Sequence, residues 1–228
     1  DSTSKNSVRA SSFLEHLNLD PIMPELDKHY SVKEGEETYP RRAMFKIMVW
    51  RKIKKIKYFT RAENHLKNHP EEAIELGFNI DCNGDAVIPD HETLRHFEKI
   101  RLGNEGMDAI MQLFCIKVVG NGKKFSLKIG ERTGTDSTPI GIPNDPDGIY
   151  NGHYKKNMVK MHITCDYDHN IPLAKQVCGG TEDDDKYLES MLKKKAISAK
   201  KNMQETWFDG GYNSHKNIAL THIEFGLT

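Results

Sequence analysis

The sequence has 228 residues, a formal net charge of zero and four cysteines, with 37% hydrophobic and 29% charged residues. This length suits one large domain or two smaller ones and allows a sizeable core. No apolar run approaches the roughly 20 residues that cross a bilayer, and the first ten residues lack the apolar core of a signal peptide. The cysteines form no C-x-x-C pair, which favours reduced thiols over a zinc site. We therefore expect a cytoplasmic protein without a membrane partner.

The zero net charge hides a basic segment. Residues 41–70 contain ten Lys or Arg and one acid, Glu63, whereas residues 1–40 and 71–108 carry net charges of −4 and −7. Such a segment indicates an anionic partner, because phosphate contacts require only positive charge. A basic run is also typical of a solvated helix face, so charge alone leaves both interpretations open.

The first part of the chain has helical spacing. Phe45, Val49, Ile53 and Ile56 recur at steps of three and four and predict a helix that starts after Pro40. Further helices are predicted at 61–68, after the N-cap Asp90, and at 107–118, before a glycine-rich break at 119–124. We expect residues 1–122 to form a helical N-terminal domain.

The pattern after this break is that of an α/β domain, at residues 123–228. Strands are predicted at 125–138, 158–165, 171–178 and 205–209, and helices at 181–196 and after 214. Turn residues at 166–170 join the second and third strands into a hairpin. Acidic residues 183–185 favour a helix N-terminus through its dipole. The predicted fold class is therefore α/β, or α+β over the whole chain.

Asp136 and Asp209 lie at or near the ends of the first and last predicted strands. Strand ends beside loops are where an α/β sheet usually holds its functional groups. Carboxylates that converge from neighbouring strands can hold the pair of Mg²⁺ ions that phosphodiester cleavage requires. An aspartate at a strand end is also commonly a cap or a solvated turn residue, so position alone leaves the metal site open.

Short segments of the second half resemble the catalytic domain of insertion-sequence DDE transposases and follow the order of that family. They are GTDSTPI at 134–140, YNGH at 150–153, VKMHI at 159–163, IPLA at 171–174 and WFDGGYNS at 207–214. In the first half, YPRRA at 39–43 and IPDHETL at 88–94 are similar to the helical N-terminal domain of the insertion-sequence-four/five-like group. The resemblance spans residues 25–225.

The resemblance implies a DNA transposase with an incomplete ribonuclease-H-like catalytic domain that depends on Mg²⁺ or Mn²⁺. Asp136 and Asp209 would be its metal-binding catalytic residues. His162 lies in the family's Lys-x-His pattern and is predicted as a further catalytic residue, the alternative being an ordinary strand residue.

The partner implied by this resemblance is double-stranded DNA, at element ends and target, bound by a homodimer in a prokaryotic nucleoid. The predicted DNA-contacting residues are Arg41, Arg42, Arg51, Lys52, Lys54, Lys55, Lys57 and Arg61. A basic run taken alone favours a solvated helix face, and the resemblance to transposases is the reason to prefer a DNA interface here.

One departure concerns the third carboxylate, which the family places as a glutamate on a helix well beyond the second aspartate. Glu224 follows Asp209 too soon for that pattern. We therefore expect the third carboxylate beyond Thr228 and a truncated catalytic domain. Three alternatives follow: a DNA-binding remnant without catalysis, another metal-dependent nuclease or integrase of the same fold, or a structural or regulatory helical protein.

Overall fold

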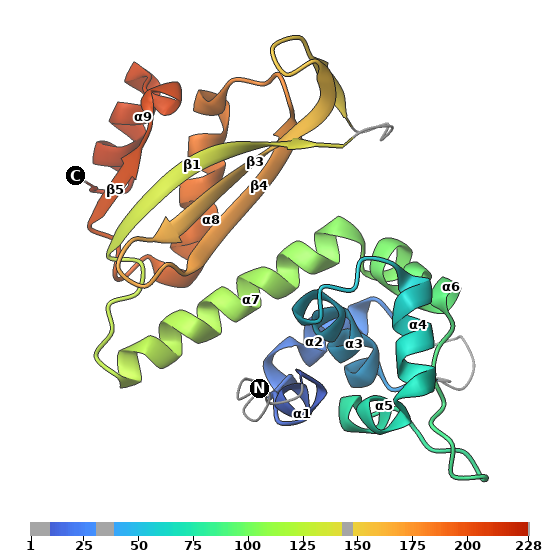
Figure 1. The fold of residues 1–228 in the computed structure, drawn as a ribbon. Coiled ribbons are helices and arrows are strands. Elements are labelled where there is room, and N and C mark those ends of the chain that lie inside the picture. Colours follow the sequence, from blue (N-terminus) through green and yellow to red (C-terminus); the bar gives the residue numbers. More distant parts are fainter. Residues whose placement is uncertain (1–9, 31–38, 143–147, 228) are drawn as a thin grey trace, which may run out of the picture. The chain divides into compact units, whose positions relative to one another are not determined.

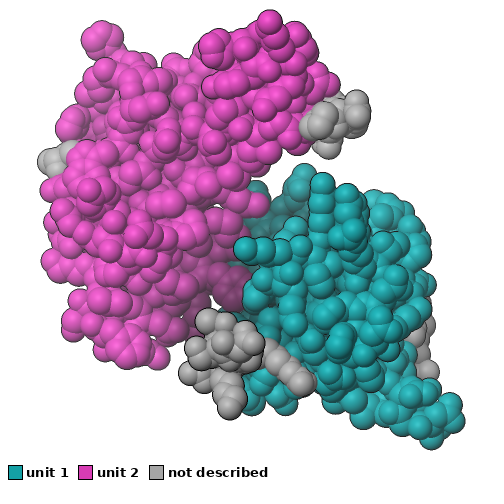
Figure 2. Space-filling view, viewed as in Figure 1, with its two compact units in different colours: residues 1–110 teal, residues 111–228 magenta. Residues whose placement is uncertain are grey.

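A computed structural model of the chain describes residues 10–30, 39–142 and 148–227. It divides into two compact units, residues 1–110 and residues 111–228 (Figure 1, Figure 2). The predicted boundary between residues 122 and 123 lies near the end of helix α7 (Gly103–Lys124), which both units share. All four cysteines are free. None of the described helices is both long and apolar enough to cross a membrane.

Unit 1 is helical, as the spacing of its apolar residues predicts. Its elements are α1 (Ala10–Glu15), the 3-10 helix η1 (Asp20–Ile22), α2 (Met23–Lys28), α3 (Arg41–Ile53), α4 (Phe59–Asn68), α5 (Pro70–Leu76), α6 (His91–His96), the π-helix η2 (Phe97–Leu102) and the start of α7. The predicted cap of α6 is confirmed, because Asp90 Oδ1 accepts the Thr93 backbone N–H at 2.7 Å. Helix α3 ends before Ile56, since Lys55 has a φ of 56° and leaves the right-handed helical region.

Helix α3 is the centre of unit 1. Its residues from Ala43 to Met48 are all buried, although the sequence predicts an apolar stripe on one face only. Contacts with α1 and α5 explain the difference, because they cover further sides of α3. Lys46 is tolerated there because its Nζ donates to the backbone oxygen of Glu15 at 3.1 Å.

Unit 2 is built on a five-stranded mixed sheet. Its strands are β1 (Arg132–Gly141), β2 (Ile149–Asn151), β3 (Lys156–Asp166), β4 (Pro172–Gly179) and β5 (Glu205–Phe208). Strand β3 pairs antiparallel with β1, β2 and β4, and the predicted hairpin is its pairing with β4. Strand β1 pairs on its other edge with β5, and this pair is parallel.

Helices pack against this sheet and complete two small cores. They are the 3-10 helix η3 (Asp184–Tyr187), α8 (Leu188–Ala199), the 3-10 helix η4 (Gly210–Tyr212), α9 (His215–Ala219) and the π-helix η5 (Leu220–Glu224). Helix α8 lies along β3 and β4 (Figure 1). Leu188 and Leu192 of α8 pack with Tyr212 and Leu227, and Ala199 packs with the residues around Leu173.

The segment that leads from α7 into β1 differs from the prediction. Helix α7 continues through Gly120 to Lys124, and β1 begins at Arg132 instead of residue 125. Gly122 is required for packing, because a Cβ there would lie 2.6 Å from Ile129 Cδ1. Gly122 therefore marks a close approach between the helix end and the following loop, whereas Gly120 has open space around it, and the predicted helix break at this point is wrong. The predicted fold class is confirmed, since a helical unit is followed by a mixed sheet with helices.

Candidate active site

The parallel pairing of β1 and β5 brings the two predicted catalytic aspartates to neighbouring positions. Thr135 of β1 pairs with Phe208 of β5 in the last pair of this ladder. Asp136 and Asp209 are the next residue on each strand, and both are exposed to solvent. Neighbouring parallel strands run side by side at about 4.8 Å, so the two residues leave the ladder together.

Backbone hydrogen bonds orient both carboxylates. Asp136 Oδ1 accepts the N–H of Ser137 at 2.7 Å, and Asp209 Oδ1 accepts the N–H of Gly211 at 3.0 Å. Asp209 thereby caps η4, the short turn formed by Gly210–Tyr212. Each of these hydrogen bonds involves only one oxygen of its carboxylate, and the second oxygen takes no part in it.

The donor chemistry of this pair fits a divalent cation. Mg²⁺ and Mn²⁺ prefer carboxylate oxygens and keep several water ligands, so a site can rest on few protein side chains. Within residues 10–30, 39–142 and 148–227, no three His, Cys, Asp or Glu side chains form a group that could hold a metal ion. Among the described residues, the candidate protein ligands of a divalent ion are therefore these two aspartates. Water or substrate oxygens would supply its other ligands.

His162 lies inside the protein, whereas both aspartates are exposed to solvent. It pairs with Ser137, while Asp136 pairs with Ile163, so alternation along the strands places His162 and Asp136 on opposite faces of the sheet. Its side chain has 0% exposure, and its pKa is lowered by that burial. Nδ1 lies 2.6 Å from the Tyr212 hydroxyl.

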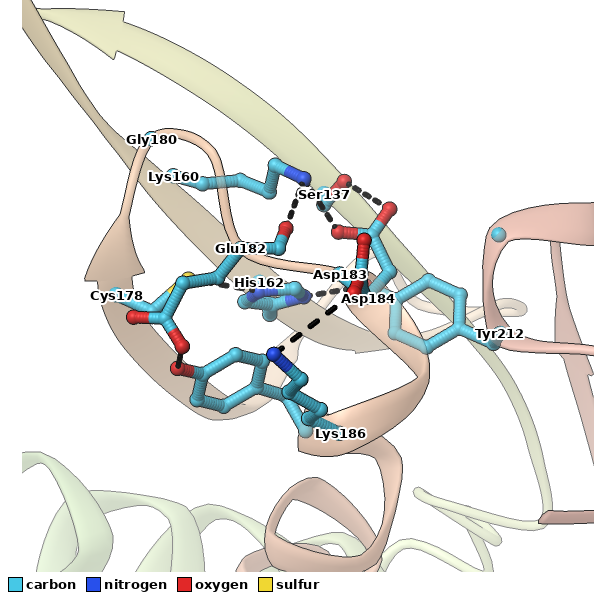
Figure 3. Close-up of polar contacts among 12 residues, drawn as sticks. Ser137, Lys160, His162, Cys178, Gly180, Glu182, Asp183, Asp184, Lys186 and Tyr212 are labelled. Atoms are coloured by element: carbon cyan, nitrogen blue, oxygen red, sulfur yellow. Dashed lines mark hydrogen bonds and ion pairs between the residues drawn. The ribbon is translucent and has the colours of Figure 1, made fainter. Parts of the chain in front are cut away.

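This environment gives His162 a supporting position. Besides Tyr212, its ring contacts Cys178, with Nε2 3.3 Å from Sγ (Figure 3). It also stacks on Tyr187 at a centroid distance of 4.8 Å. Burial raises the pKa of Tyr212, so its hydroxyl stays protonated and can donate to the imidazole. Through Tyr212, His162 holds the turn that directly follows Asp209.

Asp184 belongs to the same cluster, although the sequence assigns residues 183–185 only to a helix N-terminus. Its Oδ2 accepts the Ser137 hydroxyl at 3.0 Å and its Oδ1 accepts Lys160 Nζ at 2.8 Å (Figure 3). Its side chain is 14% exposed. Three consecutive aspartates carry no signal in the sequence that distinguishes the one that turns inward.

Half of the predicted DNA-contacting residues pair with acids of unit 1. Arg41 binds Asp27 at 2.7 Å, Lys54 binds Glu72 at 3.2 Å, and Arg42 binds Asp20. Arg51 is 4% exposed, pairs with Glu98 and lies over the ring of Phe59. We leave Arg51 out of any DNA-contacting surface, because a phosphate cannot reach a buried guanidinium.

The other half forms an exposed group at the junction of α3 and α4. Lys52, Lys55, Lys57 and Arg61 are exposed, and in the described part of the chain they form no ion pair. Tyr58 lies among them and is 51% exposed. Lys57 Nζ and Arg61 Cζ lie 5.5 Å and 5.4 Å from the centre of its ring. These five residues are called the basic patch below.

Comparison with solved structures finds a chain of the "Mos1 transposase paired-end complex with left transposon end", at 12% sequence identity and a TM-score of 0.31. The alignment covers 86% of this chain and 61% of that chain. The present chain thus spans less than two thirds of that chain, and a TM-score at this level does not establish a common fold. No curated protein matches the sequence. Residues 2–99 match the family model "Transposase domain (DUF772)", so the N-terminal part of the chain is similar to a transposase domain.

Proposed function

We propose that this chain is part of a DDE-type DNA transposase, in which Asp136 and Asp209 bind the divalent ions for strand cleavage and strand transfer. The observation that carries the proposal is the parallel register of β1 and β5, which ends one residue before each of these two aspartates. The match of residues 2–99 to a transposase domain supports the class of protein. In this proposal residues 123–228 form a ribonuclease-H-like catalytic domain, and the ion is Mg²⁺ or Mn²⁺.

The proposed reaction cleaves a DNA strand at the end of an element and joins the freed 3′-hydroxyl to target DNA. When bound, the metal ions would supply activation of the attacking oxygen and stabilisation of the leaving oxygen. Asp136 and Asp209 contribute negative charge and oriented oxygen ligands at the open ends of two strands. Their backbone hydrogen bonds hold both carboxylates before the ions arrive, which lowers the cost of reorganisation.

Binding of Mn²⁺ tests the metal proposal without an activity assay. Asp136→Asn and Asp209→Asn are each expected to weaken Mn²⁺ binding at least about tenfold, because loss of a group that supports a metal site typically has this effect. The measurement is titration of Mn²⁺ followed by electron paramagnetic resonance. Asp183→Asn is the matched control, since the Asp183 side chain is 79% exposed and outside the pair. Equal affinities in all three variants and the unmodified protein would contradict the proposal.

We further propose that the basic patch contacts the DNA backbone. Four exposed cations, two of which lie near the exposed ring of Tyr58, would provide phosphate contacts, and each contact releases counterions. We assign the DNA contact to the patch instead of to all eight predicted basic residues. Arg41, Arg42 and Lys54 are left out because they already neutralise acids of their own unit. Assembly as a homodimer on paired DNA ends remains a prediction of the same reaction.

Salt dependence of DNA binding tests the basic patch. Changing Lys52, Lys55, Lys57 and Arg61 to glutamine, one at a time, is expected to reduce the slope of log K against log salt by about one for each phosphate that the variant no longer binds. The measurement is fluorescence anisotropy of duplex DNA at several salt concentrations. Arg95→Gln is the control, because Arg95 is an exposed cation that pairs with Glu92 at 2.8 Å. If the slope is the same in the patch variants and in the control, the patch does not contact the DNA backbone.

A further inference from the structure

Asp184 binds Ser137, which follows Asp136, and lies close to Gly211, which is two residues after Asp209. On the β1 side, its Oδ2 accepts the hydroxyl of Ser137, whose backbone N–H binds Asp136. On the β5 side, a Cβ added to Gly211 would lie 2.9 Å from Asp184 Oδ2 and 3.2 Å from Asp209 Oδ1. The Gly211 N–H is also the donor to Asp209. One carboxylate therefore binds Ser137 and lies close to Gly211, the two residues whose backbone N–H groups orient the aspartate pair.

Lys160 fixes the carboxylate of Asp184 in this place. Its Nζ donates to Asp184 Oδ1 at 2.8 Å and to the backbone oxygen of Glu182 at 2.7 Å. The side chains of Lys160 and Asp184 are 19% and 14% exposed, so water screens the pair less than a surface pair. Because Lys160 belongs to β3, the bond ties the segment before α8 to the centre of the sheet.

The neighbouring Asp183 shows that this contact is not a general property of the acidic run. Its side chain is 79% exposed and lies 3.7 Å from Lys186, one turn further along. Asp184 binds Ser137 and Lys160, whereas Asp183 pairs with Lys186 (Figure 3). A helix dipole would favour both aspartates alike, so the inward position of Asp184 requires the specific partners described above.

We propose that Asp184 is a positioning residue of this site, which sets the geometry of Asp136 through Ser137 and that of Asp209 through Gly211. The inference rests on the proposed metal-binding function of the two aspartates. Groups that hydrogen-bond directly to a metal ligand commonly change metal affinity 10–100-fold, and Asp184 stands one contact further from each aspartate. Asp184 acts on both aspartates at once. The Lys160 ammonium neutralises the charge of Asp184, so Asp184 does not compete with them for the cation.

The test compares Mn²⁺ binding by the full chain and its Asp184→Asn variant. Asparagine keeps the shape of the side chain but removes the charge and one acceptor oxygen, so we expect about tenfold weaker binding and a broadened spectrum of bound Mn²⁺. Asp183→Asn is the matched control and is expected to bind like the unmodified protein. Far-ultraviolet circular dichroism verifies that each variant is folded at the temperature of the titration.

Ser137→Ala is the second variant, because it removes only the hydroxyl that joins β1 to Asp184. A smaller loss of affinity in the same direction is expected, and this variant decides the question if Asp184→Asn does not fold. If the unmodified chain binds Mn²⁺ and Asp136→Asn does not, while Asp184→Asn and Ser137→Ala match the control, the positioning role is overturned and the proposed function stands. If the unmodified chain binds no Mn²⁺, the proposed function fails and the inference fails with it.

Discussion

Replacing Glu72 with glutamine is expected to lower the free energy of unfolding at neutral pH by about 3 kcal/mol. Glu72 is 5% exposed in unit 1 and accepts the Trp50 indole N–H at 2.9 Å. Its carboxylate also lies 3.1 Å from His65 Nε2 and 3.2 Å from Lys54 Nζ. Glutamine keeps the size of the side chain but loses the charge that these donors stabilise, and it adds a buried N–H₂ group beside them.

The same charge predicts an acid-dependent loss of stability. Burial by itself would raise the pKa of Glu72, but hydrogen bonds from His65, Trp50 and Lys54 outweigh it and lower the pKa to about 2. A folded pKa below the ordinary value of 4.5 means that the stabilisation is complete above pH 4.5. It is lost as the pH falls from 4.5 toward 2, because the unfolded chain then binds the proton first.

Urea unfolding at a series of acidic pH values measures this contribution. The unmodified protein should lose stability more steeply below pH 4.5 than Glu72→Gln does. Glu71→Gln is the control, since its side chain is 48% exposed and a surface ion pair with His69 contributes little. Parallel curves for the unmodified protein and Glu72→Gln would show that the carboxylate is not stabilised by its buried partners.

Local signals in the sequence predict much of this fold. The cap at Asp90, the turn between β3 and β4 and the short strand β5 depend on neighbouring residues, and all three are found close to where the sequence places them. The interior of α3 is different, because its burial depends on α1 and α5, which come from other parts of the chain. Arg51 and Lys52 are equivalent as a basic pair in sequence, yet only Arg51 is buried.

The candidate site also depends on contacts between residues that are distant in the sequence. The motifs around Asp136 and Asp209 nominate both residues, but their adjacency depends on the parallel pairing of two strands that are distant in the sequence. The role of Asp184 depends on contacts with Ser137 and Lys160, which no spacing rule predicts. His162 looks like its polar neighbours in an alternating strand, and only the packing of Tyr212 and Tyr187 shows that it is enclosed.

Lys195 is expected to make unit 2 more stable as the pH rises from 8 to 10. Its side chain is fully buried, and Nζ donates to Thr133 Oγ1 at 2.6 Å. Burial lowers the pKa of Lys195 to about 8, although nearby Asp166 opposes this effect. Between this value and the ordinary 10.5 the unfolded chain holds a proton that the folded chain has released. Stability therefore rises with pH in this window, by up to about 1.4 kcal/mol per pH unit.

The measurement is the difference in free energy of unfolding between the unmodified protein and Lys195→Met across this window. Methionine has no titratable group, so the difference should grow in favour of the unmodified protein as the pH rises. All other ionisable groups are common to both proteins, so their contributions cancel in the difference. Lys193→Met is the control, because Lys193 is exposed and its pKa is raised by a hydrogen bond to Glu189. A difference that does not change with pH would mean that Lys195 keeps its proton in the folded protein, with Asp166 as the partner that outweighs burial.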